Sequence, residues 1–285
     1  ALCDRAGVGA AAGDVNGDGY ADVAVGVTYA GSTGYVFVYL GGVNGAGNSS
    51  SISAPPASIT LPEPGVAGGR FGASVATADD VNGDGFADLV VGAPGVPSGT
   101  GSAYVYLGGP AGLGTTASRV LTGPGGVNGQ FGVSVSSAGD LNGDGLADLV
   151  IGAPGVNISA GMAYVYLAVA GPSTTPSLTL PGGGTAGDLF GASVAGAGDT
   201  NGDLYADLIV GAPGVNSGTG QAYVYNGLSS GIPTMPSATL SSPEGTGANF
   251  GYQVASASGV IDGPCRRWLS WGHGARRSAL CVDRL

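Results

Sequence analysis

The sequence predicts an all-β protein built from four-stranded antiparallel sheets, one for each repeat of about 60 residues. Two observations lead to this fold class. A nine-residue motif occurs four times, beginning at Asp14, Asp80, Asp140 and Asp199, so that successive copies are 66, 60 and 59 residues apart. Each copy is surrounded by short apolar runs that glycine and proline interrupt, and the repeats lack the periodicity of amphipathic helices.

The composition agrees with a chain of many short strands and turns. Among 285 residues there are 59 Gly and 17 Pro, and the glycines recur at fixed offsets, which separates this chain from a disordered one. The net charge of −11 argues against binding to nucleic acid. Three Cys near the termini make no disulfide framework, and no apolar run is long enough to span a membrane. The sequence does not begin with the basic and apolar regions of a signal peptide, so any such peptide would have been removed or would lie outside this sequence.

The second repeat shows the predicted unit most completely. We expect strands over 71–78, 87–94, 101–109 and 117–121, with the nine-residue motif between the first two. The second and third runs are apolar on both faces, which is typical of strands that are covered on both sides. Four strands in each repeat, with every sheet covered by its neighbours, describe the blade of a β-propeller.

The repeats predict four complete blades and a degenerate fifth. The expected boundaries are 1–66 (with an atypical start), 67–126, 127–186, 187–246 and 247–285. In the first repeat Arg5-Ala6 replaces the Phe-Gly pair of the other repeats, so its first strand is in doubt. The number of blades and the closure of the ring stay open, and a ring that one chain does not close would expose apolar faces and self-associate.

The motif D-x-N-G-D-x-x-A-D places carboxylate or amide oxygens at positions 1, 3, 5 and 9, and position 7 adds a backbone carbonyl. We expect the Asp at position 9 to close the coordination shell as a bidentate ligand, while glycine at position 6 permits a sharp bend. The predicted metal ligands are Asp14, Asn16, Asp18, Tyr20 and Asp22 in the first loop, Asp80, Asn82, Asp84, Phe86 and Asp88 in the second, Asp140, Asn142, Asp144, Leu146 and Asp148 in the third, and Asp199, Asn201, Asp203, Tyr205 and Asp207 in the fourth.

The metal that we predict is Ca²⁺, with up to four ions, because Mg²⁺ demands stricter octahedral geometry. The fourth site is expected to be the weakest, since Leu204 stands at position 6 and would be strained at positive φ. The alternative is a set of metal-free turns in which Asp and Asn cap their own backbone. That alternative explains a single Asp-Asn-Gly turn but not three carboxylates at fixed offsets in four copies.

Three further motifs recur in a constant order around the loops. Phe-Gly pairs begin at 71, 131, 190 and 250, Gly-Ala-Pro triplets span 92–94, 152–154 and 211–213, and Tyr-Val-Tyr runs span 104–106, 164–166 and 223–225. Over about residues 14 to 257 the sequence therefore resembles the FG-GAP repeat family, which forms the β-propeller of integrin α-subunits and occurs in many bacterial surface and secreted proteins.

The resemblance implies a propeller, usually of seven blades, with calcium in the loop between the first two strands of a blade. It also implies a secreted or cell-surface location. Ligand recognition in that family tends to use loops on the opposite face, which correspond here to 95–100, 155–160 and 214–219.

We expect no catalytic residues and no organic cofactor, and hence no enzyme. His273 is the single His, Lys is absent, and no Gly-x-Ser-x-Gly motif occurs. The predicted function is a non-catalytic recognition or adhesion module in which Ca²⁺ clamps the first hairpin of each blade, with an unknown protein or glycan as partner. The alternatives are a carbohydrate-binding propeller and an accessory domain of a larger extracellular hydrolase.

The last residues depart from the repeat. A fifth metal loop should begin at Gly259, but residues 258–285 contain both Trp, the single His and five of the eight Arg instead. One interpretation is a genuine basic and aromatic tail for partners or anionic surfaces, and the other is a frameshifted remnant of the fifth repeat. Either kind of tail should pack poorly.

Overall fold

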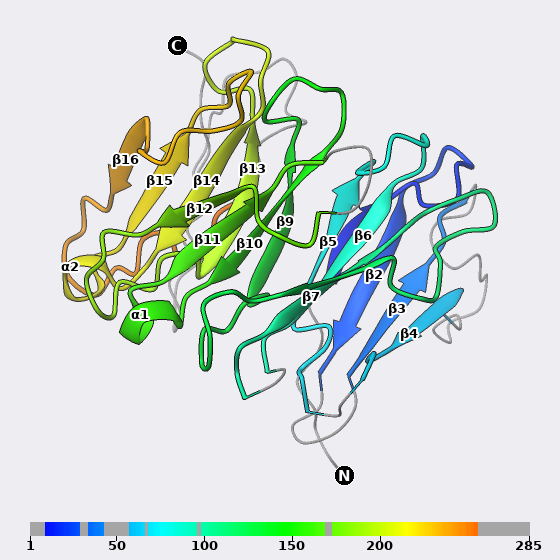
Figure 1. Ribbon diagram of the computed structural model, residues 1–285, viewed down its shortest axis with the longest axis horizontal. Helices are drawn as coiled ribbons and strands as arrows, with labels where there is room; N and C mark the ends of the chain where they lie inside the picture. The colour runs from blue at the N-terminus through cyan, green and yellow to red at the C-terminus, as the bar shows by residue number, and fades with distance from the viewer. Residues whose placement is uncertain are drawn as a thin grey trace.

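The computed structural model describes residues 9–28, 34–42, 57–65, 68–95, 98–168 and 173–255. They form four antiparallel sheets of four strands each, and we call these sheets blades 1 to 4 (Figure 1). Blade 1 consists of β1 (Gly9–Gly13), β2 (Asp22–Val27), β3 (Tyr35–Tyr39) and β4 (Ile59–Pro62), and blade 2 of β5 (Ser74–Asp79), β6 (Asp88–Ala93), β7 (Ser102–Tyr106) and β8 (Arg119–Thr122). Blade 3 consists of β9 (Ser134–Gly139), β10 (Asp148–Ala153), β11 (Met162–Tyr166) and β12 (Leu178–Pro181), and blade 4 of β13 (Ser193–Gly198), β14 (Asp207–Ala212), β15 (Gln221–Tyr225) and β16 (Ala238–Ser241).

The all-β propeller architecture is confirmed: within each blade the strands follow one another in chain order, and the blades stand side by side. The first strands β1, β5, β9 and β13 contact one another in sequence and so face the centre of the arrangement. The described blades form an arc that is not closed. No helix among the described residues is long and apolar enough to cross a membrane.

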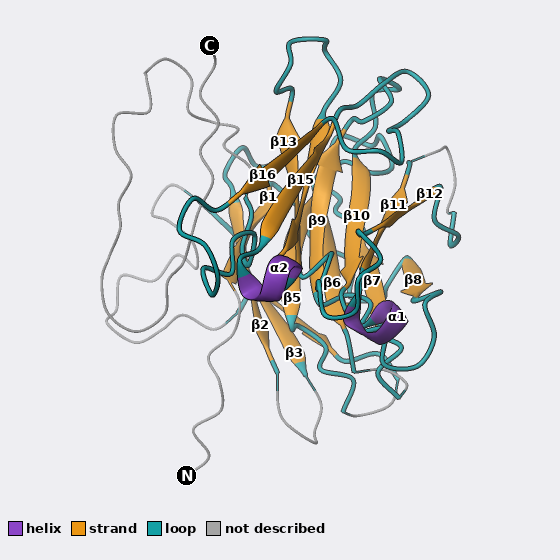
Figure 2. Ribbon diagram, turned by 90° about the vertical axis from the view of Figure 1, so that its left-hand side faces the viewer, coloured by secondary structure: helices purple, strands orange, loops and turns teal. Residues whose placement is uncertain are grey.

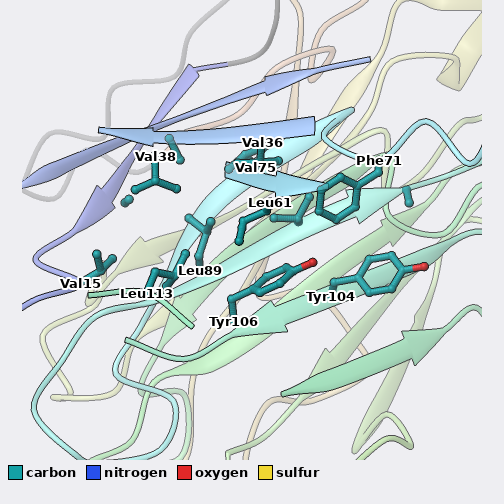
Figure 3. Packing of buried hydrophobic residues seen from close by; sticks show 14 residues of the cluster. Val15, Val36, Val38, Leu61, Phe71, Val75, Leu89, Tyr104, Tyr106 and Leu113 are labelled. Atoms are coloured by element: carbon teal, nitrogen blue, oxygen red, sulfur yellow. The ribbon is translucent and has the colours of Figure 1, made fainter. Parts of the chain in front are cut away.

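Neighbouring blades pack through two different faces. Figure 3 shows the junction of blades 1 and 2, where aliphatic Val36 and Val38 lie opposite aromatic Phe71 and Tyr106. The same pairing of an aliphatic face with an aromatic face recurs between blades 2 and 3 and between blades 3 and 4. At each junction the aromatic rings come from one blade and pack onto the smaller aliphatic side chains of the other. The junction is therefore close-packed although only one of its two faces is aromatic.

The aromatic face of blade 1 has no described blade against it. Tyr35 and Phe37 stack on this face with centroids 6.2 Å apart. Val23 is 38% exposed, whereas Leu89 at the same register position of blade 2 is completely buried. The outer apolar face of the arc is therefore partly open to solvent.

The glycines of the Phe-Gly and Gly-Ala-Pro motifs allow the backbones of adjacent blades to touch. A Cβ atom on Gly152 would lie 1.9 Å from the carbonyl oxygen of Gly191 in the next blade. In the same region the hydroxyl of Ser134 donates a hydrogen bond of 2.9 Å to that carbonyl. Gly191 itself has a φ of +82°, a conformation that favours glycine.

The predicted strands form, with shifts at their ends that have local causes. The strand expected over 71–78 begins at Ser74, because Arg70 and Gly72 at positive φ turn the chain first. The doubtful first strand of repeat one does form: β1 pairs with β2 from Gly9 opposite Val25 onward. Arg5 and Ala6 lie outside the described residues, as do residues 258–285.

In the described part of the chain, two one-turn helices interrupt the strands: α1 (Val156–Ser159) and α2 (Val215–Gly218). Both follow Gly-Ala-Pro and both are tight turns, since they contain consecutive residues at positive φ. Ile158 in α1 has a φ of +58° and is 85% exposed, although a β-branched residue disfavours this conformation.

The blade contact at Gly152 is directly testable. Gly152→Ala should lower the free energy of unfolding by about 3 kcal/mol, because the new methyl group meets backbone and one blade must move. Gly42→Ala is the control, since a Cβ there would meet nothing within 4 Å, and it should change stability by less than about 0.5 kcal/mol. Urea denaturation of both variants measures the difference, and equal stabilities would contradict the proposed contact.

Candidate metal centre

The nine-residue motifs form the loops that join the first and second strands of the four blades. In the second loop, Asp80 Oδ1 accepts a hydrogen bond from the Gly83 amide at 2.7 Å and its Oδ2 accepts one from the Gly85 amide at 2.8 Å. The other three loops repeat this bonding. The Asp at position 1 therefore folds the loop around its own carboxylate, as Asx turns do.

Positions 3 and 5 bond to each other in every loop. Asn82 Nδ2 donates to Asp84 Oδ2 at 2.9 Å, and Asp84 Oδ1 accepts the Phe86 amide at 3.0 Å. The equivalent bonds occur in the remaining loops. The Asn and Asp side chains thus lie within the same short turn, while Asp84 itself is exposed.

The Asp at position 9 is completely buried in all four loops. Asp88 Oδ2 accepts the amide of Val81 inside the loop at 3.0 Å, and its Oδ1 accepts the amide of Gly108 at 2.8 Å. Gly108 follows the third strand β7, so one carboxylate ties the loop to a segment twenty residues away. Gly41, Ala168 and Gly227 donate the corresponding bonds in the other blades. The motif alone gives no sign of this partner.

Burial raises the pKa of the carboxyl groups of Asp22, Asp88 and Asp148. The pKa of Asp88 rises to about 6 and that of Asp148 to about 7, chiefly because burial disfavours the charged form. Two amide hydrogen bonds oppose the rise in each case, and the carboxylates at positions 1 and 5 add to it by repulsion. The pKa of Asp22 is raised for the same reasons. The carboxylates of one loop are therefore close enough to repel one another.

The chemistry of the donor set suits a hard divalent cation. Each loop provides three carboxylates and an amide oxygen within nine residues, and a carboxylate has about four lone-pair sites, so bonds to amides leave room for a cation. A cation would also favour the charged form of the buried carboxyl group. The side chains do not converge on one point: the described residues hold no group of three or more His, Cys, Asp or Glu placed to hold a metal ion.

The fourth loop differs from the others at two positions. Leu204 has a φ of +76° where the other loops have glycine, and its side chain is 90% exposed. The expected strained conformation is therefore present, while the expected weakness of this site stays a prediction. Thr200 at position 2 adds a hydroxyl donor to Asp207, a bond that the other loops lack.

A groove lies at the other end of the blades, where the second and third strands are joined. It has a volume of about 560 Å³ and runs between residues 185–188 and 214–218, the segment that contains α2. Asp188 lines this groove and is 6% exposed. Figure 2 shows α1 and α2 projecting from neighbouring blades on the same side of the sheets.

Comparison with known proteins agrees with this geometry. The FG-GAP repeat model matches residues 6–39, 71–106, 131–166 and 190–225. The chain therefore belongs to the FG-GAP repeat family, and its repeats are of the kind found in integrin alpha chains.

Three relatives show the extent of the similarity. Integrin alpha-IIb of Mus musculus is 35% identical over 161 residues, which are 53% of this chain and 15% of the relative. Integrin alpha-PS5 of Drosophila melanogaster is 35% identical over 174 residues, 57% of this chain and 16% of the relative. Integrin alpha-6 of Gallus gallus is 39% identical over 136 residues, 46% of this chain and 12% of the relative. The matched region thus spans about a sixth or less of each relative.

The two kinds of Asp in a loop should respond differently to substitution. Asp148→Ala leaves the buried amides of Leu141 and Ala168 without an acceptor, so it should already cost about 2–6 kcal/mol in EDTA, with a larger loss in calcium because a proposed ligand is removed as well. Asp144→Ala removes an exposed carboxylate and should cost less than about 1 kcal/mol in EDTA, with a larger loss in calcium. Urea denaturation in both buffers gives the comparison, and equal losses in EDTA would refute this division of roles.

Proposed function

We propose that this chain is a non-catalytic recognition module of the adhesion type, a β-propeller whose blades are stabilised by calcium. The observation that carries the proposal is the recurrence of one oxygen-rich loop at the same end of four blades in a repeat shared with integrin alpha chains. The same relationship supports a secreted or cell-surface location.

Calcium has a structural role in this proposal. The ligands would be the side chains at positions 1, 3, 5 and 9 and the carbonyl at position 7 of each loop. Since the Asp at position 9 already joins the loop to the end of the third strand, a cation held by it would link three strands of the blade. It would also offset the cost of burying the charged carboxylates of Asp88 and Asp148, which chiefly raises their pKa, and the smaller repulsion from the other Asp residues of the loop.

Removal of calcium should lower the stability of the whole protein. A ligand that binds only the folded state stabilises it by an amount that grows with the ratio of its concentration to its Kd, about 2.7 kcal/mol for each site at a hundredfold excess. Calorimetric melting in 2 mM calcium, 2 mM magnesium and EDTA measures the effect. We expect the highest Tm in calcium, and identical melting temperatures in calcium and EDTA would refute structural calcium binding.

Recognition is proposed to use the end of the blades opposite the calcium loops. The groove between residues 185–188 and α2 combines a volume of about 560 Å³ with the carboxylate of Asp188, the amide of Asn216 and the hydroxyl of Ser217. Asp188 lines this groove, so its carboxylate would accept hydrogen bonds from a partner that offers donor groups. The partner proposed is a protein.

Binding assays with neutralised carboxylates test this surface. The immobilised chain is screened against extracellular matrix proteins and against a glycan array, in calcium and in EDTA. We expect calcium-dependent binding of a protein that Asp188→Asn weakens at least about tenfold, the effect of losing one charged hydrogen bond. Asp79→Asn is the matched control, since it removes the same charge at an exposed residue outside the groove. Glycan binding alone would favour the carbohydrate-binding alternative, and equal effects of both substitutions would rule out this groove.

A further inference from the structure

A small cavity lies between blades 2 and 3, apart from the groove. Arg119 at the start of the outer strand β8 and Tyr166 at the end of β11 both line it. The remaining wall is largely apolar, with Val105 and Leu121 from blade 2 and Leu149 from blade 3. The space available inside is about 20 Å³.

Two buried polar atoms at this cavity have no hydrogen-bond partner. They are Nε of Arg119 and the hydroxyl oxygen of Tyr166, whose side chain is 4% exposed. Buried polar atoms in folded proteins are nearly always hydrogen-bonded, because leaving one unpaired costs free energy. Two such atoms at one small cavity point to something that both of them bind.

Cavity size restricts what that partner is. A single water needs about 10–15 Å³ of such space, so 20 Å³ admits one water and excludes organic molecules. We propose that an ordered water molecule fills this cavity, accepting a hydrogen bond from Arg119 Nε and bonding with the Tyr166 hydroxyl. The water joins the outer strand of blade 2 to the third strand of blade 3.

The surrounding charges favour a neutral occupant over an anion such as chloride. Val81 and Ala168 line the cavity, and their amides are the ones that hold the buried carboxylates of Asp88 and Asp148. The attraction of Asp88 acts on Arg119 and opposes the lowering of its pKa by burial. The carboxylate of Asp88 thus partly balances the positive charge of Arg119. An anion in the cavity would be repelled by the carboxylates of Asp88 and Asp148.

The cavity belongs to one junction of the four-blade arc. In each blade, the valine at the fourth position of the third strand pairs with the first residue of the fourth strand, which in blade 2 is Arg119 opposite Val105. The corresponding residues are Ile59, Leu178 and Ala238, all apolar. An apolar residue therefore suits this position in the fold, so Arg119→Leu is a natural matched substitution.

The direction in which Tyr166→Phe changes the Tm distinguishes a water-filled cavity from an empty one. If water bridges the two groups, Tyr166→Phe removes a hydrogen-bond partner and should lower the Tm. If the cavity is empty, the same substitution removes an unpaired hydroxyl and should leave the Tm unchanged or raise it, which would overturn the proposal. Tyr225→Phe, at the corresponding position of β15, is the control and should change the Tm little because its hydroxyl is not among the unpaired buried atoms.

A double-mutant cycle and a crystal structure complete the test. Since Arg119→Leu and Tyr166→Phe disrupt the same bridge, the Tm loss of the double variant should be smaller than the sum of the two single losses. Additive losses would contradict a shared water. Crystals grown in bromide should show density for one water within hydrogen-bond distance of both groups, without anomalous signal. An anomalous peak would show that an anion occupies the cavity and would refute the proposed water. An absence of density would refute the site.

Discussion

The close approach of the blades at their paired glycines is the constraint on which the rest of the structure depends. A side chain at Gly152 would overlap the backbone of Gly191, so the blades reach contact distance only where both residues are glycine. That distance brings the aromatic face of one blade onto the aliphatic face of the next and allows Ser134 to bond across the junction. The Phe-Gly and Gly-Ala-Pro motifs are thus two sides of one contact, which explains why they recur together.

The buried Asp at the end of each loop connects this packing to the candidate metal centre. Asp148 accepts hydrogen bonds from the start of its own loop and from Ala168, two residues after the third strand, so the loop cannot move without disturbing the blade. Its burial raises its pKa, and a cation in the loop would counter that cost. The loops therefore serve as parts of the blade framework first, and the proposed calcium strengthens a connection that hydrogen bonds already make.

The opposite end of the blades has a different physical character. There the chain turns through residues at positive φ, and Ile158 and Ser217 stand in a conformation that residues other than glycine disfavour. Strained, exposed turns held on rigid sheets are typical of binding surfaces. The groove beside α2 adds the carboxylate of Asp188 as an acceptor for a partner's donor groups, and this is why we place recognition at that end.

The sequence by itself determined the repeat length, the order of the strands and the donor set of each loop, because these depend on short-range patterns: apolar runs, turn residues and fixed Asp spacing. It anticipated the strain at Leu204 for the same reason. Only the tertiary structure decided the partner of Asp88, the contact of Gly152 with the next blade and the cavity between Arg119 and Tyr166. Each of these features brings together residues from different strands or blades. How close such residues lie depends on the way the strands pair and the sheets pack, and no local sequence pattern encodes that packing.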